Sequence, residues 1–251
     1  MELIIAGFHR SGTSFTTQML NQAGMFVGSD LMGVDRSNPY GHFEDREVVG
    51  LHDEILRSNG KTWQIDGPLI PAVTGQQWDE LQRIVSTRRQ LNLFWGFKDP
   101  RVCHFLGLWK HVMPEAKVLA VYRHYGACVR SLHRRHGEQL YRKKGPPEVH
   151  RRFFEEPDLG LRMWLHHNKA LVREAKRRPE HTMVVSFERL AEGFPLVSRL
   201  TERWGLPLDS DVVDNYDPAA TTNVQSIPTL DDDLVDEADQ TLTMLKELHA
   251  A

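Results

Sequence analysis

The feature that most constrains the fold is an apolar run that stops at a glycine-rich turn and continues as an amphipathic segment. Residues 2–6, ELIIA, have the length and character of a strand buried on both faces. Gly7 and Gly12 bound the turn, and a helix is predicted over residues 13–22. The first N–H groups of a helix lack intrahelical partners and lie at the positive end of its dipole. The junction therefore predicts an anion-binding loop.

Three further apolar runs of strand length lie at residues 93–98, 117–122 and 182–187. Segments with helical spacing of apolar residues alternate with these runs, at residues 13–22, 43–60, 74 onward, 124–136, 159–177, 194–204 and 234–248. Strands that alternate with helices predict βαβ units and a central parallel sheet with helices on both faces. We expect a single three-layer α/β domain over residues 1–251, because no repeat or linker interrupts the pattern.

Composition excludes several classes of protein. The 251 residues are 40% hydrophobic and 26% charged, which is typical of a globular protein. The net charge of −3 does not point to nucleic acid or to an anionic membrane as a partner. No apolar run approaches the roughly 18 residues that a membrane span needs. The two cysteines, Cys103 and Cys128, lack the spaced partners of a zinc site or a disulfide framework. We therefore expect a cytoplasmic protein without a metal.

The loop departs from the pattern of proteins that bind nucleoside triphosphates. In the motif G-x-x-x-x-G-K-[ST], Gly7, Gly12 and Ser14 match, but Thr13 takes the lysine position. A kinase or NTPase would lack the ammonium group that bridges the β- and γ-phosphates. The cation lies instead at Arg10, which suits a 5′-monophosphate-like anion. Two alternatives remain open. One is a P-loop kinase or NTPase, and the other is a non-catalytic module that binds nucleotides or polyanions.

Two motifs carry a resemblance to a known family. RSGTS, residues 10–14, resembles the 5′-phosphosulfate-binding loop of sulfotransferases that use 3′-phosphoadenosine 5′-phosphosulfate (PAPS). Arg123 ends a predicted strand and Ser131 follows eight residues later, as in the 3′-phosphate motif of that family. An arginine at a strand end points to the crevice where open α/β sheets bind ligands. The resemblance, which also covers GFKDPR (96–101) and residues 186–209, implies the sulfotransferase fold.

The same resemblance implies an aromatic clamp for the adenine ring. Phe187 lies where the family has a base-contacting aromatic residue, and Phe15 lies where a tryptophan often stacks on the ring. Both residues could instead be ordinary core aromatics. The implied nucleotide-binding residues are Arg10, Ser11, Gly12, Thr13, Ser14, Phe15, Arg123, Ser131 and Phe187.

The reaction that the resemblance implies is metal-independent, in-line transfer of a sulfuryl group from PAPS to an acceptor hydroxyl or amine. The product nucleotide is the 3′,5′-bisphosphate (PAP). Such a transfer needs a cation at the bridging oxygen and a base for the acceptor proton. Arg10 takes the place of the catalytic lysine of the family. Lys98 is the second candidate for the cation, unless it forms a buried ion pair with Asp99.

The expected base is Glu44. Several branches of the family use a glutamate a few tens of residues after the loop, and the stretch GHFED brings Glu44 together with His42 and Asp45. His42 and His52 are reserve bases. The branch that sulfates small molecules in the cytosol has its histidine near residues 98–101, where this sequence has none. Glu44 and Asp45 could instead be carboxylates that stabilise a helix N-terminus.

The stretch from Arg101 to Arg152 is basic, with twelve arginines and lysines against three glutamates. The connector at 134–152 could attract an anionic acceptor or form a lid over the site. It could equally be a solvated surface balanced by the acidic residues between 209 and 233.

Overall fold

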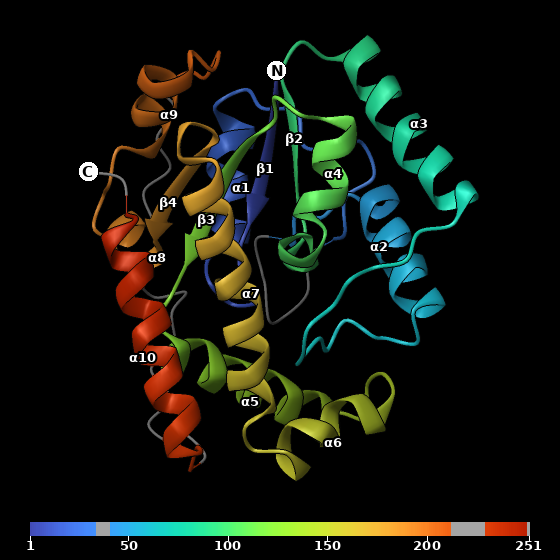
Figure 1. The fold of residues 1–251 in the computed structure, drawn as a ribbon, viewed down its shortest axis with the longest axis vertical. Helices are drawn as coiled ribbons and strands as arrows, with labels where there is room; N and C mark the ends of the chain where they lie inside the picture. The colour runs from blue at the N-terminus through green and yellow to red at the C-terminus, as the bar shows by residue number, and fades with distance from the viewer. Residues whose placement is uncertain (34–40, 212–228, 250–251) are drawn as a thin grey trace.

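The computed structural model describes residues 1–33, 41–211 and 229–249, and it has a central sheet between layers of helices (Figure 1). The four strands of the sheet lie in the order β2-β1-β3-β4, and each neighbouring pair is parallel. The strands are β1 (Glu2–Ala6), β2 (Trp95–Lys98), β3 (Lys117–Tyr122) and β4 (Thr182–Ser186). The predicted α/β fold with a parallel sheet flanked by helices is therefore confirmed.

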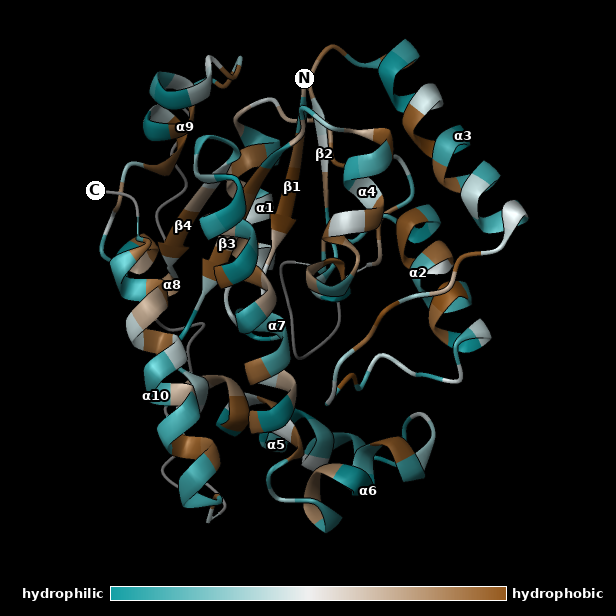
Figure 2. Ribbon diagram, viewed as in Figure 1, coloured by the Kyte–Doolittle hydropathy of each residue, from teal (hydrophilic) through white to brown (hydrophobic). Residues whose placement is uncertain are grey.

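Alternate residues of the strands face two separate cores, as the two-residue period of a strand requires. Leu3 and Ile5 of β1 pack in the core beneath α1 (Thr13–Gln22) and α9 (Leu196–Trp204). Ile4 and Ala6 pack in the opposite core, which holds residues of the helices that cover the other face. Strands β1, β3 and β4 are accordingly among the most hydrophobic parts of the chain, whereas β2 is paler (Figure 2).

The other helices are α2 (Arg46–Ser58), α3 (Gly75–Leu91), α4 (Leu106–Val112), α5 (Tyr125–Tyr141), α6 (Pro147–Glu155), α7 (Leu159–Arg177), α8 (Phe187–Ala191) and α10 (Asp232–Glu247). Short 3₁₀ turns lie at Pro100–His104 and Pro179–His181. None of the helices in the described ranges is both long and apolar enough to cross a membrane.

The structure corrects the prediction in two places. The connector expected at 134–152 contains the end of α5 and most of α6, which begins with Pro147 at its first turn. This helix was missed because it is short, with only Val149 and the buried Phe153 one turn apart, too few to define a helical period in the sequence. The strand expected over 182–187 ends at Ser186, whose hydroxyl accepts a hydrogen bond from the Arg189 N–H (3.2 Å) and caps α8. Parts of the loops expected at 24–42 and 208–233 lie outside the described residues.

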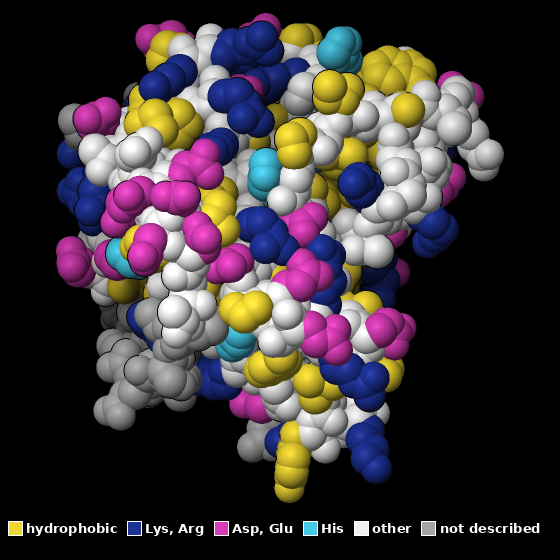
Figure 3. All heavy atoms as spheres, turned by 60° about the horizontal axis from the view of Figure 1, so that its bottom comes forward, with side chains coloured by type: hydrophobic (Ala, Val, Ile, Leu, Met, Phe, Trp, Pro, Cys, Tyr) yellow, Lys and Arg dark blue, Asp and Glu magenta, His cyan; other side chains and the backbone are white. Residues whose placement is uncertain are grey.

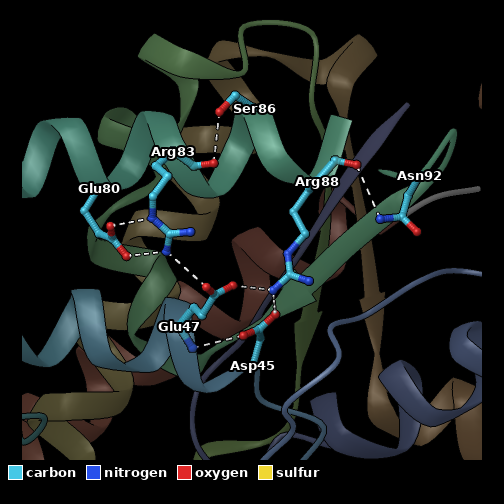
Figure 4. Close-up of polar contacts among 7 residues, drawn as sticks. All are labelled: Asp45, Glu47, Glu80, Arg83, Ser86, Arg88 and Asn92. Atoms are coloured by element: carbon cyan, nitrogen blue, oxygen red, sulfur yellow. Dashed lines mark hydrogen bonds and ion pairs between the residues drawn. The ribbon is translucent and has the colours of Figure 1, made fainter. Parts of the chain in front are cut away.

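A buried polar network fixes the start of α2 against the end of α3 (Figure 4). The Asp45 carboxylate accepts a hydrogen bond from the Glu47 N–H (3.0 Å) and an ion pair from Arg88. Arg88 also contacts the Glu47 carboxylate at 2.7 Å. Burial raises the pKa of Asp45, while the Arg88 guanidinium opposes that rise. Asp45 thus caps the N-terminus of α2, the alternative role that the sequence left open for it. The cap also fixes the position of Glu44, which immediately precedes it.

Candidate functional site

The loop after β1 has the backbone conformations that its glycines predict. Gly12 has φ 90°, and a Cβ there would lie 2.1 Å from Cδ2 of Phe187. A Cβ on Gly7 would lie 2.4 Å from the Val121 carbonyl oxygen, so both positions exclude a side chain. Arg10 has φ 67°, in the left-handed region that non-glycine residues rarely adopt. Such strain is typical of functional loops, where the surrounding structure must impose it.

The hydroxyl groups of the loop have different surroundings. The Ser11 hydroxyl is buried and donates to the Phe8 carbonyl at 2.6 Å, so it stabilises the turn from within. The Ser14 hydroxyl lies 3.2 Å from the His42 carbonyl and 3.2 Å from Lys98 Nζ. No side chain caps the N-terminus of α1, so its first N–H groups remain directed at the loop.

Residues far apart in the sequence converge beside this loop. Arg10 Nε donates to the Ser131 hydroxyl at 2.9 Å, and Arg123 Nη1 lies 3.4 Å from the Arg10 carbonyl oxygen. The Arg123 guanidinium lies over the Phe187 ring, 4.6 Å from its centre. The structure thus brings together the loop, both residues of the predicted 3′-phosphate motif and one residue of the predicted clamp. They meet because β1, β3 and β4 are neighbours whose carboxyl ends lie at one edge of the sheet.

The second residue of the predicted aromatic clamp, Phe15, has surroundings that differ from those of Phe187. It is partly buried and packs against the core beneath α1 and α9, whereas Phe187 contacts the loop itself.

A second polar group lies on the other side of the loop. Lys98 Nζ is 2.6 Å from Glu44 Oε1, and only 1% of the Lys98 side chain and 14% of the Glu44 side chain are exposed. The ion-pair partner of Lys98 is therefore Glu44, and not Asp99, which the sequence had left open as an alternative. The pair is anchored to the loop because the ammonium group also contacts Ser14. The candidate base and the second candidate cation are thus direct partners.

Asp99 instead belongs to a buried network that the sequence did not predict. Its carboxylate lies 2.7 Å from His52 Nδ1 and 2.8 Å from Arg101 Nε. Burial alone would raise the pKa of Asp99, but Arg101 and His52 hold it well below its usual range. The Trp109 indole N–H donates to His52 Nε2 at 2.8 Å, so that nitrogen must be an acceptor. With both ring nitrogens bonded in the core, His52 is a structural residue and not a reserve base.

Three more histidines gather on the same side of the loop as α7. They are His9, which directly precedes Arg10, His104 from the turn after β2, and His167 from α7. No sequence pattern predicted this group, because its members come from three unrelated segments. Among the described residues no group of three or more His, Cys, Asp or Glu side chains could hold a metal ion.

The basic stretch is divided in the structure. Arg152 pairs with Asp66 and Glu156, whereas Arg142, Lys143 and Lys144 lie exposed at the end of α5. In Figure 3 several basic side chains gather at the top of the face that is drawn, and elsewhere basic side chains are mixed with acidic and apolar ones.

Comparison with known proteins agrees with this geometry. No curated protein matches the sequence. A solved structure, the "Sulfotransferase Domain from the Curacin Biosynthetic Pathway", superposes with a TM-score of 0.55 at 11% identity, over 97% of this chain and 96% of that one. At that identity the likeness shows a shared fold. The sequence also matches a family described as "Sulfotransferase family" over residues 2–210, which is most of the chain. The chain therefore belongs to the sulfotransferase family.

Proposed function

We propose that the protein transfers a sulfuryl group from PAPS to an acceptor hydroxyl or amine, without a metal. The observation that carries the proposal is the convergence of the loop with Arg123, Ser131 and Phe187. Two groups of anion donors, the loop and the pair Arg123 and Ser131, lie there beside an aromatic ring, as a nucleotide with a 5′-phosphosulfate and a 3′-phosphate would require.

The loop would hold the 5′-phosphosulfate. Its glycines leave space for close approach, and the N-terminus of α1, whose N-cap Gly12 has no side chain, offers backbone N–H groups and a favourable dipole. Arg123 and Ser131 would hold the 3′-phosphate, and Phe187 would contact the adenine. PAPS supplies the sulfuryl group, and the chemistry that remains for the protein is positioning, charge stabilisation and proton removal.

Two cations flank the loop, and Arg10 is the first and Lys98 the second candidate to stabilise the bridging oxygen as it leaves. Arg10 lies in the loop itself, where its Nε donates to Ser131, and the guanidinium has further N–H groups for the donor. Lys98 lies at Ser14 on the opposite side, already fixed beside Glu44. Glu44 would take the proton from the hydroxyl or amine of the acceptor substrate. Lys98 would hold the Glu44 carboxylate in position for that step.

Calorimetry with PAP, 5′-AMP and ATP–magnesium tests the nucleotide assignment. PAP should bind best, and Arg123→Ala should weaken it about tenfold or more, since a charged hydrogen bond contributes roughly 1.5–3 kcal/mol. The affinity for 5′-AMP should fall only a few-fold, through loss of the contact with Phe187. Arg142→Ala, which removes an exposed arginine of the same region, is the control. Equal affinities for PAP and 5′-AMP, or tightest binding of ATP–magnesium, would contradict the assignment.

Turnover with sulfur-labelled PAPS and a panel of hydroxyl and amine acceptors tests the catalytic roles. Removal of one preorganised donor typically costs about 10²–10³ in rate. Arg10→Ala should therefore lower kcat on that scale with a smaller loss of PAP affinity. If Arg10→Ala keeps its kcat and Lys98→Met loses it, the leaving-group cation is Lys98.

A further inference from the structure

The backbone of Arg123 lies in the junction between β3 and α5. Because β3 ends at Tyr122 and α5 begins at Tyr125, Arg123 belongs neither to the strand nor to the helix. Its carbonyl oxygen accepts a hydrogen bond from the indole Nε1 of Trp164 at 3.0 Å. Trp164 lies on α7, which carries none of the residues proposed to bind the nucleotide. The bond therefore joins the predicted 3′-phosphate motif to a helix outside that motif.

The indole of Trp164 is a donor with a fixed position. Its side chain is fully buried, in the core that holds Ile4 and Ala6 of β1. The Tyr125 ring meets the Trp164 ring edge-on, with the ring centres 5.7 Å apart. Close packing of this kind leaves a large ring few other rotamers. The N–H group therefore stays directed at the Arg123 carbonyl.

The C-terminal helix supports this arrangement. Helices α7 and α10 lie side by side along most of their length (Figure 1). Burial, and after it a hydrogen bond to Asp239 of α10, raises the pKa of the Tyr125 phenol. Tyr125 thus links α10 to Trp164, although α10 lies beyond residue 210, where the match to the sulfotransferase family ends.

The contacts of the Arg123 side chain are weaker than its backbone anchor. The guanidinium lies over the Phe187 ring at 4.6 Å, and Nη1 lies 3.4 Å from the Arg10 carbonyl oxygen. A cation–π contact at a partly exposed site is weak, and 3.4 Å is longer than an ordinary N–H···O bond. An arginine side chain also has many rotamers. The place of the guanidinium therefore depends on the backbone from which the side chain starts.

We propose that Trp164 is a positioning residue of the 3′-phosphate site. Its indole N–H fixes the backbone at Arg123 and thereby directs the guanidinium toward the 3′-phosphate of the nucleotide. The inference rests on the proposed binding of PAPS, and it assigns a role to a residue that does not touch the nucleotide. The loop that would hold the 5′-phosphosulfate has its own contacts, so Trp164 acts on a nucleotide with a 3′-phosphate and not on 5′-AMP.

Calorimetry of Trp164→Phe with PAP and with 5′-AMP tests this role. Phenylalanine keeps an aromatic ring in the core and removes the N–H group. The affinity for PAP should fall about 3–10-fold, the scale of one net hydrogen bond, whereas the affinity for 5′-AMP should stay near that of wild type.

Trp109→Phe is the matched control. Trp109 is also fully buried, and its indole N–H donates to His52 at 2.8 Å in the structural network around Asp99. Both variants lose one buried hydrogen bond and some stability, which urea unfolding measures. Only Trp164→Phe should lower the ratio of the PAP affinity to the 5′-AMP affinity.

A double-variant cycle shows whether the effect depends on the Arg123 side chain. In Arg123→Ala the guanidinium is absent, so the addition of Trp164→Phe should not weaken PAP further. If the double variant loses a further 3–10-fold or so, Trp164 affects the nucleotide without Arg123, and the positioning role is wrong.

The outcomes are separable from those of the proposed function. Equal affinities for PAP and 5′-AMP in wild type contradict the nucleotide assignment and, with it, this inference. A wild type that prefers PAP, together with the same preference in Trp164→Phe, overturns the role of Trp164 alone. If Trp164→Phe does not fold, 3-benzothienylalanine at position 164 decides the question, because sulfur replaces the N–H group in a ring of nearly the same shape.

Discussion

Replacing Glu44 by glutamine should reveal how strongly the Lys98 ion pair stabilises the fold. The variant leaves the Lys98 ammonium, with 1% of its side chain exposed, beside a neutral amide that can still accept one hydrogen bond. Removing one partner of a fully buried pair costs about 3–5 kcal/mol. Because Glu44 is 14% exposed and the amide oxygen remains, we expect a loss of about 2–4 kcal/mol. For a chain of this size that loss lowers Tm by roughly 4–16 °C.

Thermal and urea unfolding followed by circular dichroism measure this loss. The control is Glu80→Gln, which breaks an exposed pair with Arg83 and should cost less than about 1 kcal/mol. The double variant Glu44→Gln/Lys98→Met removes both charges and should recover at least half of the loss. A Glu44→Gln variant as stable as wild type, with no coupling to Lys98→Met, would refute the buried pair.

This prediction also changes how the role of Glu44 as a base must be tested. Glutamine at position 44 removes the basicity of the side chain and also breaks the ion pair with Lys98. Because Lys98 is its partner, a loss of turnover must be measured at a temperature where the variant is folded. PAP affinity then serves as the control for an intact site, because the residues proposed to bind PAP lie apart from the Lys98–Glu44 pair.

The remaining predictions concern the loop, the buried network and the response to acid. Gly12→Ala should lose about 2–4 kcal/mol in urea unfolding and weaken PAP about tenfold, because its Cβ would overlap Phe187; unchanged PAP affinity would argue against that contact. Asp99→Asn should lose about 3 kcal/mol, because Arg101 would keep only an exposed partner. The pKa of His167 is about 6.5 in the unfolded chain and about 3 in the folded protein. Between these pH values only the unfolded chain binds the proton of this residue. Stability should therefore fall by about 1.4 kcal/mol per pH unit for this residue, and His167→Phe should flatten the slope between pH 6.5 and 4.5.

The sequence alone determined the parts of the protein that depend on local chemistry. Four apolar runs between helical segments predicted the parallel sheet, because strand and helix periods are local properties. Gly7 and Gly12 predicted the loop, because only their lack of a side chain permits its turns. The eight-residue spacing from Arg123 to Ser131 placed both on elements that the topology then brought to the loop.

Tertiary structure decided what depends on contacts between distant segments. The sequence placed Asp99 beside Lys98, but a strand directs successive side chains to opposite faces, so Lys98 reached Glu44 instead. Asp99 was thereby directed to His52 and Arg101 in the core. The histidine group formed because the loop after β1, the turn after β2 and α7 pack at one edge of the sheet. Burial there, and not residue type, decided that the pKa values of His9 and His167 lie below the ordinary range of histidine.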